Sequence, residues 1–460
     1  MDNYNNLTEQ ISALWKRFET WEIPVHSLLA SGRDRLLWET YLPPYRADTL
    51  HRMFSITKSY CSLAIGCLAA EGKLTLDDPI IRYFPEYLPA GQTVPPYLAG
   101  MTIRHMLTMQ TCHSSTTYKL HPEQNWVESF FITPPSHKSG EIFLYDSSAS
   151  HTLAALVKKL SGTGVLDYLR HGILAGTGFS REAYIMQDPF GTEMGGSGLM
   201  ALPMDLMITA QYIMKQLRNG TGTFAGYLRE ALRCQVPTIH SGQCLDEQQG
   251  YGYQFWKIRN GSAMYGMGGQ YVLFYPESDL ILVITADSQN IKGGTQKILD
   301  AVHETLAPYC TPAKDCKPAS GSKPVFPAVP QPDPAGGTFR LHPNEGGFTE
   351  LILTTDSDGG TLILNHSDAI FRIPFGRNNQ IRTAVIDKYN QPVASSGTWL
   401  DRQTLYIYSQ LCGESVGSLS FMIRLRPDGA TLWMKKIEET IFHEFCGFAE
   451  GVRQNEAATV

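Results

Sequence analysis

The feature that most constrains this chain is a proline-rich stretch from Pro308 to Gly337 that divides it in two. Proline lacks a backbone donor and favours extended conformers, so eight prolines mixed with glycine and serine cannot build a core element. A chain of 460 residues is also too long for one compact core. We therefore predict an N-terminal domain over 1–307, a linker over 308–337 and a C-terminal domain over 338–460.

The C-terminal region consists of short runs of alternating polar and apolar residues. Turn signals such as Asp358-Gly359-Gly360 and Pro427-Asp428-Gly429 separate several of them. The runs are Phe348–Thr354, Thr361–Leu364, Ile370–Pro374, Ile381–Ile386, Thr404–Ser409, Leu419–Leu425 and Thr431–Lys435. Evenly spaced short strands of this kind predict a small all-β domain, an antiparallel barrel or sandwich. It contains no recognisable catalytic constellation.

The first 307 residues combine strands at both ends with helices between them. Two hairpins are predicted, one from Val25–Leu29 and Arg35–Tyr41, the other from Gln270–Tyr275 and Leu280–Ala286. Further segments show helical spacing: a surface helix near the N-terminus with Leu7, Ile11, Leu14, Trp15 and Phe18, then Ser55–Ala70, Ala149–Leu160 and 295–306. This order predicts an α+β fold, an antiparallel sheet flanked by helices with a helical subdomain.

Composition excludes several classes of partner. A net charge of −6 argues against nucleic acid or an anionic membrane as the main partner. The sequence has no apolar run of 18 residues, and residues 1–22 lack the features of a signal peptide. Nine scattered cysteines without a metal-ligand spacing indicate reduced thiols. We expect a cytoplasmic protein without a metal or cofactor; its oligomeric state stays open, a homo-oligomer included.

Ser55 and Lys58 open a segment that is apolar nearly all round and is therefore predicted to be a buried helix. A serine and a lysine three residues apart share one helix face, so the lysine can reach the hydroxyl. Burial at the positive end of a helix disfavours the charged lysine, and the neutral amine can then take the serine proton. A backbone amide at the helix start can also stabilise an oxyanion.

The Ser-x-x-Lys spacing alone is weak evidence, because it occurs by chance about twice in a chain of this length. A second copy, Ser320 to Lys323, lies in the proline-rich stretch and opens no buried helix. For Ser55 considered alone, a helix-capping serine followed by a lysine that reaches toward solvent is the favoured interpretation. Further motifs in a fixed order favour catalysis instead.

Tyr145 precedes the helix predicted over Ala149–Leu160, with Ser147 two residues on. The order Ser-x-x-Lys, Tyr-x-Ser and a glycine-containing strand segment resembles the serine β-lactamases and penicillin-binding proteins, closest to the class C β-lactamase-like esterases and peptidases. The resemblance covers about residues 23–308 and extends to the segments 51–80, 101–111 and 194–206. It implies that Tyr145 is a proton shuttle, either as the phenol or as the phenolate, and that Ser147 hydrogen-bonds Lys58 or the substrate.

The third motif of the family is best matched by Met264-Tyr265-Gly266, since Lys138-Ser139-Gly140 precedes Tyr145 and lies in a predicted loop. Gly266 would let the backbone approach the substrate, and the Met267 amide would complete the oxyanion hole. The glycines lead into a strand rather than a helix, which argues against a nucleotide site. The resemblance implies that the cation normally present binds a substrate carboxylate, and Met264 replaces it.

The sequence thus predicts a serine hydrolase, an esterase, amidase or peptidase that forms an acyl-enzyme on Ser55. Its substrate is expected to be a small ester or amide with little or no charge, rather than a β-lactam. An acyltransferase that uses the same acyl-enzyme stays open. A binding protein that kept only the fold is the other alternative, although Ser55, Lys58 and Tyr145 are all present.

Overall fold

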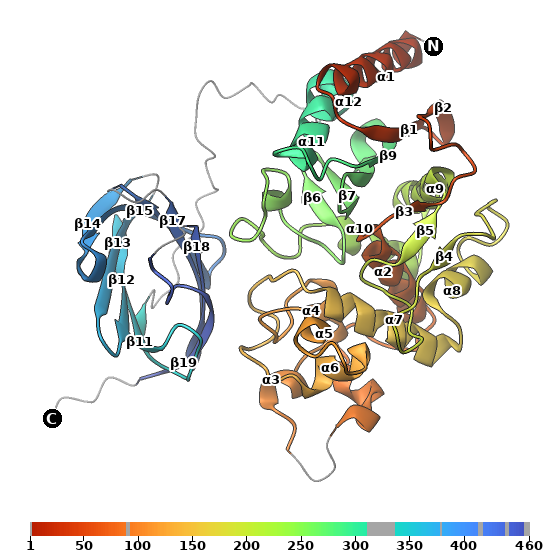
Figure 1. Ribbon diagram of the computed structural model, residues 1–460. Coiled ribbons are helices and arrows are strands. Elements are labelled where there is room, and N and C mark those ends of the chain that lie inside the picture. Colours follow the sequence, from red (N-terminus) through yellow and green to blue (C-terminus); the bar gives the residue numbers. More distant parts are fainter. Residues whose placement is uncertain are drawn as a thin grey trace.

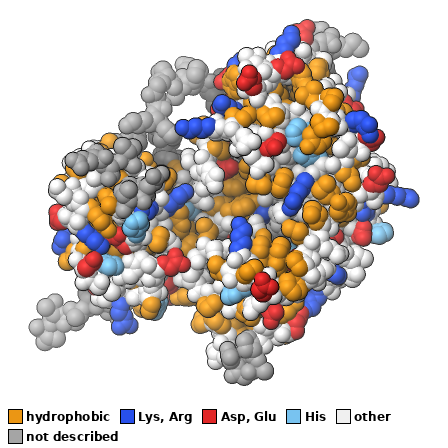
Figure 2. Space-filling view, viewed as in Figure 1, with side chains coloured by type: hydrophobic (Ala, Val, Ile, Leu, Met, Phe, Trp, Pro, Cys, Tyr) orange, Lys and Arg blue, Asp and Glu red, His pale blue; other side chains and the backbone are white. Residues whose placement is uncertain are grey.

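The computed structural model describes residues 2–88, 93–310, 336–377, 380–412, 417–437 and 441–454. They form two parts that lie against each other, an α+β domain up to residue 310 and a β-barrel from residue 336 (Figures 1 and 2). On the face shown in Figure 2, acidic and basic side chains are interspersed. The predicted fold class, α+β followed by an all-β domain, is confirmed.

The main sheet of the α+β domain has six antiparallel strands. They are β1 (Val25–Gly32), β2 (Arg35–Tyr41), β6 (Trp256–Ile258), β7 (Gly261–Gly266), β8 (Gln270–Tyr275) and β9 (Leu280–Ala286), in the order β2-β1-β9-β8-β7-β6. Both predicted hairpins are present, and the sheet joins them because β1 pairs with β9, with Leu28 opposite Ile284. β8 and β9 are buried at every position, as expected of strands covered on both faces.

Helices from the two ends of this domain pack on one another. They are α1 (Asp2–Thr20), α11 (Gly294–Thr305) and the short α12 (Ala307–Cys310) (Figure 1). Leu7, Ile11, Leu14 and Phe18 are buried along one side of α1, which is the helical spacing read from the sequence. An ion pair of 2.9 Å between Arg17 and Glu304 joins α1 to α11.

A helical subdomain separates the two hairpins. Its elements are β3 (His51–Arg52), α2 (Ile56–Ala70), α3 (Pro96–Ala99), α4 (Ile103–Leu107), α5 (Thr117–Leu120), α6 (Trp126–Ile132), α7 (Ser147–Ser161), α8 (Val165–His171), β4 (Tyr184–Ile185), β5 (Leu199–Ala201), α9 (Pro203–Asn219) and α10 (Thr223–Leu232). The predicted helix α2 lies at its centre and packs on α7, α8 and α10. It is buried on all sides because it is apolar on all sides.

The C-terminal part is a closed barrel. Its strands are β10 (Gly337–Leu341), β11 (Phe348–Thr355), β12 (Gly359–His366), β13 (Ile370–Gly376), β14 (Arg382–Ile386), β15 (Gln391–Trp399), β16 (Thr404–Leu411), β17 (Ser418–Leu425), β18 (Gly429–Ile437) and β19 (Gly447–Arg453). β10 pairs with β19, and Gly376 of β13 pairs with Ser396 of β15, which closes the ring and leaves β14 outside it. All seven predicted runs are strands; β10, β15 and β19 were not predicted.

The predicted linker lies almost wholly outside the described residues, so the domain boundaries stay a prediction. Its first three positions belong to α12, and Gly337 begins β10. Each of the seven cysteines whose side chains are described is a free thiol. Among the described residues, no helix has the length and apolar character needed to span a bilayer.

Candidate active site

Ser55 stands directly before α2, at the capping position of its first turn. The preceding residue, Phe54, has a φ of 45°, a left-handed conformation that costs a residue with a side chain about 1–2 kcal/mol. Thr57 holds this turn, because its amide and its hydroxyl both donate to the Phe54 carbonyl, at 3.0 and 2.6 Å. The Ser55 side chain makes no capping hydrogen bond to the helix. Its half-buried hydroxyl is therefore available to the side chains around it.

Lys58 lies one turn further along α2, and its Nζ is 3.0 Å from the Ser55 Oγ. The same nitrogen donates to the Gly196 carbonyl at 2.6 Å. The side chain is only 1% exposed, and burial lowers the pKa of Lys58 from 10.5 to about 7. Much of the lysine is therefore a neutral amine near pH 7. A neutral amine in contact with a hydroxyl is the arrangement that general-base activation of a serine needs.

Tyr145 comes from the segment before α7 and lies on the other side of the same pair. Its ring centroid is 4.7 Å from the Lys58 Nζ, and its phenol lies near the Ser55 side chain. The ring stacks on Trp256 of β6, with centroids 5.7 Å apart. Burial raises the pKa of Tyr145 above its ordinary value, and the neighbouring Ser55 hydroxyl only partly opposes this. The phenol therefore stays protonated near neutral pH and can donate.

Ser147 and Gly196 line the side of the site that α7 forms. Ser147 is the first residue of α7, and its amide donates to the Thr116 hydroxyl at 3.3 Å. A Cβ added to Gly196 would lie 3.2 Å from the Ser147 Cβ and 3.7 Å from the Lys58 Nζ. The Gly196 backbone thus fits between Ser147 and Lys58, where a larger residue would not.

Asp146, between Tyr145 and Ser147 in the chain, anchors the start of α7. It is fully buried and accepts hydrogen bonds from the Ser148 amide, at 2.8 Å, and from the Thr111 hydroxyl, at 3.2 Å. Burial raises the pKa of Asp146. As the capping residue of α7 it fixes where the helix begins, and therefore where the side chains on either side of it point.

The third predicted segment lies at the end of β7, beside the nucleophile. A Cβ on Gly266 would lie 2.2 Å from the Met53 carbonyl oxygen, so only glycine lets β7 approach the backbone of Met53, the residue before Phe54, so closely. Met264, two residues earlier, is 1% exposed, whereas Met267 is 49% exposed. Met267 is followed by Gly268 and Gly269, both at positive φ. Contacts of Met264 and of the Met267 amide with a substrate stay predictions.

Of the predicted residues, the fold brings Lys58 and Tyr145 to Ser55, and it places Ser147 beside Gly196 and Gly266 beside Met53. The sequence did not point to three neighbours: Gly196, Asp146 and Trp256. The pair Gly195-Gly196 was the available signal for the first, since adjacent glycines often mark close backbone approach. The rejected match Lys138-Ser139-Gly140 lies in a loop, as expected. Among the described residues, no group of His, Cys, Asp and Glu could hold a metal ion.

Comparison with known proteins finds relatives of the α+β domain. A model of the family described as Beta-lactamase matches residues 17–306. Esterase EstB from Burkholderia gladioli is 43% identical over 67 residues, which are 14% of this chain and 16% of that esterase. The 6-aminohexanoate-dimer hydrolase of Paenarthrobacter ureafaciens is 22% identical over 303 residues, 60% of this chain and 76% of the relative.

Solved structures extend the likeness to the whole chain. The octameric penicillin-binding protein homologue from Pyrococcus abyssi has a TM-score of 0.52 and 16% identity, and the match covers 96% of this chain and 99% of that one. At this identity the likeness concerns the fold alone. It includes the combination of an α+β domain with a C-terminal barrel.

Proposed function

The chain belongs to the β-lactamase family of hydrolases, and we propose that it cleaves a small uncharged ester or amide through an acyl-enzyme on Ser55. One observation carries the proposal: the Lys58 Nζ is 3.0 Å from the Ser55 Oγ, in a buried position where the pKa of the lysine falls to about 7. A lysine that served only to pair with an anion or to reach solvent would not need this burial.

The reaction follows from these contacts. Lys58 takes the proton of Ser55 as the Oγ attacks the substrate carbonyl, and the C–O bond of the acyl-enzyme forms. The proton then passes through the Tyr145 phenol to the leaving alcohol or amine as its bond to the carbonyl carbon breaks. Water then attacks the carbonyl carbon of the acyl-enzyme and loses its proton to Lys58 and Tyr145. The bond from this carbon to the Ser55 Oγ breaks, the Oγ regains a proton, and the acid is released. The Ser55 and Met267 amides are the proposed donors to the oxyanion.

The proposed substrate class rests on the β7–β8 segment. Residues 261–275 contain no charged side chain, so this edge of the site offers no cation for a substrate carboxylate. The names of the two relatives, an esterase and a 6-aminohexanoate-dimer hydrolase, agree with an acyl substrate. We test the proposal with neutral esters, amides and a chromogenic cephalosporin, using intact-mass spectrometry to detect acylated protein. If the protein hydrolyses the cephalosporin efficiently but does not hydrolyse neutral esters, the proposal is wrong.

Tyr145→Phe is expected to lower kcat by about 10²–10⁴-fold for substrates with poor leaving groups. The phenylalanine keeps the ring on Trp256 but removes the proton donor. An activated phenyl ester, whose leaving group needs no proton, should lose much less. The measurement is kcat for an alkyl ester and a nitrophenyl ester in both proteins. Equal losses for the two esters would remove Tyr145 from the proton transfer.

The pH dependence is expected to follow Lys58. Protonated lysine cannot accept the Ser55 proton, so kcat/KM for a neutral ester should fall about tenfold per unit as pH drops below about 7. The raised pKa of Tyr145 keeps its proton on, so no matching loss is expected at mildly alkaline pH. Steady-state kinetics from about pH 5 to pH 10, with circular dichroism as a check on folding, measure this. A flat profile would exclude Lys58 as the base.

A further inference from the structure

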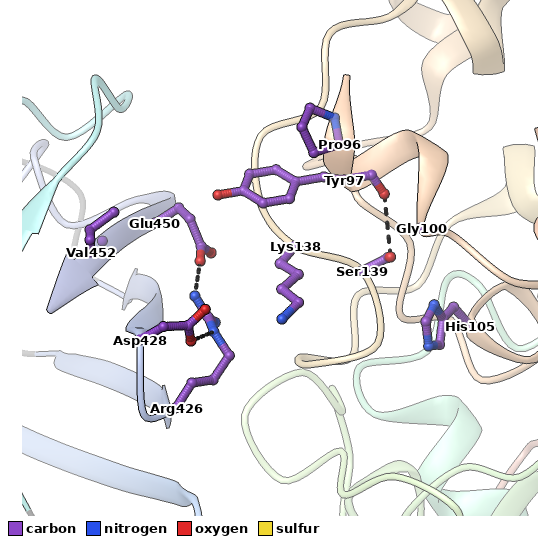
Figure 3. A pocket seen from close by; sticks show the side chains of 11 residues that line it. Pro96, Tyr97, Gly100, His105, Lys138, Ser139, Arg426, Asp428, Glu450 and Val452 are labelled. Carbon is purple, nitrogen blue, oxygen red and sulfur yellow. Dashed lines mark hydrogen bonds and ion pairs between the residues drawn. The ribbon is translucent and has the colours of Figure 1, made fainter. Parts of the chain in front are cut away.

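The segment that leads to Tyr145 lies in the contact between the two domains. A cavity of about 380 Å³ opens beside it, with Tyr97 and Lys138 from the α+β domain on one side and Arg426 and Asp428 from the barrel on the other (Figure 3). At this cavity the chain passes from Lys138 to Glu141, four residues before Tyr145. Three successive residues of this segment are held here, Glu141 and Ile142 by side chains of the barrel and Phe143 by His240 of the α+β domain, which itself contacts the barrel.

Glu141 is held by charge. Its Oε2 is 2.5 Å from the Arg426 guanidinium, and the Thr431 hydroxyl donates to it as well. Arg426 also pairs with Glu450 of β19 (Figure 3). Glu450 in turn accepts from the Thr431 hydroxyl at 2.6 Å. The side chains of Glu141 and Glu450 are 8% and 3% exposed, so this pairing is screened little by solvent. Losing Arg426 would leave both buried carboxylates without their cation.

Ile142 is held by an apolar row on the outside of the barrel. Met422 pairs with Trp433 across β17 and β18, and Trp433 pairs with Phe448 across β18 and β19. Ile142 completes this cluster at 1% exposure. β18 is buried over its first six positions. In β11, by contrast, buried and more exposed residues alternate, as in a strand with one face toward solvent. The α+β domain therefore covers the outer face of β18.

Phe143 is held through its backbone. Its carbonyl accepts a hydrogen bond of 2.8 Å from the His240 Nε2. The His240 ring in turn meets the Trp433 ring edge to face, with centroids 4.6 Å apart. Burial lowers the pKa of His240 to about 4, so the ring stays neutral and this hydrogen bond persists near neutral pH. A side chain of the barrel thus supports the donor that fixes the backbone two residues before Tyr145.

We propose that the barrel positions Tyr145 for proton transfer, with Trp433 and Arg426 as positioning residues that act through the segment Glu141–Phe143. The inference rests on the proposed function, because it assumes that Tyr145 moves the proton. A ring that must reach the Ser55 hydroxyl has little tolerance, since a displacement of about 1 Å can cost about 100-fold in rate. The barrel is therefore part of the catalytic apparatus without touching the substrate.

A double-mutant cycle tests this in the full chain. Trp433→Ala is expected to lower kcat for an alkyl ester by about 10- to 100-fold, with KM changed less than about twofold. In the Tyr145→Phe background the same substitution should cost almost nothing more, because the proton donor is already gone. Phe371→Ala is the matched control: Phe371 lies in the barrel core against Phe348 and Phe445, outside the domain contact.

Trp433→Leu guards against loss of folding, since leucine keeps an apolar cover over Ile142 while removing the ring against His240. It should give a smaller loss of kcat that also disappears in the Tyr145→Phe background. If the Trp433 substitutions lower kcat by the same factor with Tyr145 present and with Tyr145→Phe, the positioning role is wrong, whatever Tyr145 does. If Tyr145→Phe itself leaves kcat unchanged, the proposed proton transfer fails first, and the positioning role fails with it.

Discussion

Ser55→Ala is expected to abolish turnover, with kcat lower by about 10⁶-fold for every ester and amide that the native chain hydrolyses. The reason is that the acyl-enzyme cannot form without the Oγ, and Lys58 then has no nucleophile to activate. The fold should be unaffected, because the Ser55 side chain makes no capping hydrogen bond to α2. Labelling by a fluorophosphonate probe, located by peptide mass spectrometry, should disappear together with turnover.

The matched control for this experiment is Ser320→Ala. Ser320 and Lys323 repeat the Ser-x-x-Lys spacing in the proline-rich stretch, so the control separates spacing from placement in a buried helix. Full labelling and turnover are expected in this variant. A probe adduct on any other residue in Ser55→Ala, with turnover retained, would show that the nucleophile has been assigned wrongly.

The elements that could be predicted from sequence are those whose pattern is local. α2 was predicted because a segment that is apolar on all sides has to be buried, and the hairpins because turn residues separate their strands. β15 was missed because its sequence, with Pro392 and Gly397 among small polar residues, does not read as a strand. The structure explains Gly397: a Cβ there would lie 2.6 Å from the Phe375 ring. That reason is tertiary and leaves no local signal.

In the candidate site, too, the contacts within one helix could be predicted from the sequence, whereas the contacts between distant segments could not. Ser55 and Lys58 meet because they are three apart on one helix, which sequence alone can show. The Gly196 carbonyl that also binds Lys58 lies 138 residues away in the chain, and only the folded subdomain brings it there. Glu141 and Ile142 gave no signal of their own, since their partners are on β17, β18 and β19 of the barrel and in the turn between β17 and β18. The sequence leaves the role of the C-terminal domain open, because no local pattern marks the residues through which the two domains meet.

Lys58→Met should lower kcat by about 10²–10⁴-fold, the usual contribution of a general base. Methionine fills the same buried space but cannot accept the Ser55 proton. The fall of kcat/KM below about pH 7 should also disappear in this variant, because no group of that pKa would then control the reaction. Ser55 should still react slowly with a fluorophosphonate at high pH, where hydroxide replaces the lysine. Leu63→Met, a substitution at another fully buried position of α2, is the control for repacking.

Stability should change in the opposite direction from activity. The Lys58 pKa falls from 10.5 unfolded to about 7 folded, so at neutral pH folding must drive off a proton that the unfolded chain keeps. At about 1.4 kcal/mol per pKa unit, the lowered pKa of Lys58 reduces the free energy of unfolding by about 4 kcal/mol at pH 7. This destabilisation decreases as pH rises toward 10.5. Losing the hydrogen bond to the Gly196 carbonyl costs Lys58→Met about 1–2 kcal/mol. The variant should therefore be more stable by about 2–3 kcal/mol near pH 7, with the gain shrinking in alkaline solution. Chemical denaturation at several pH values measures this; a gain that does not depend on pH would mean that Lys58 is not neutral in the folded site, and that another group sets the acidic limb.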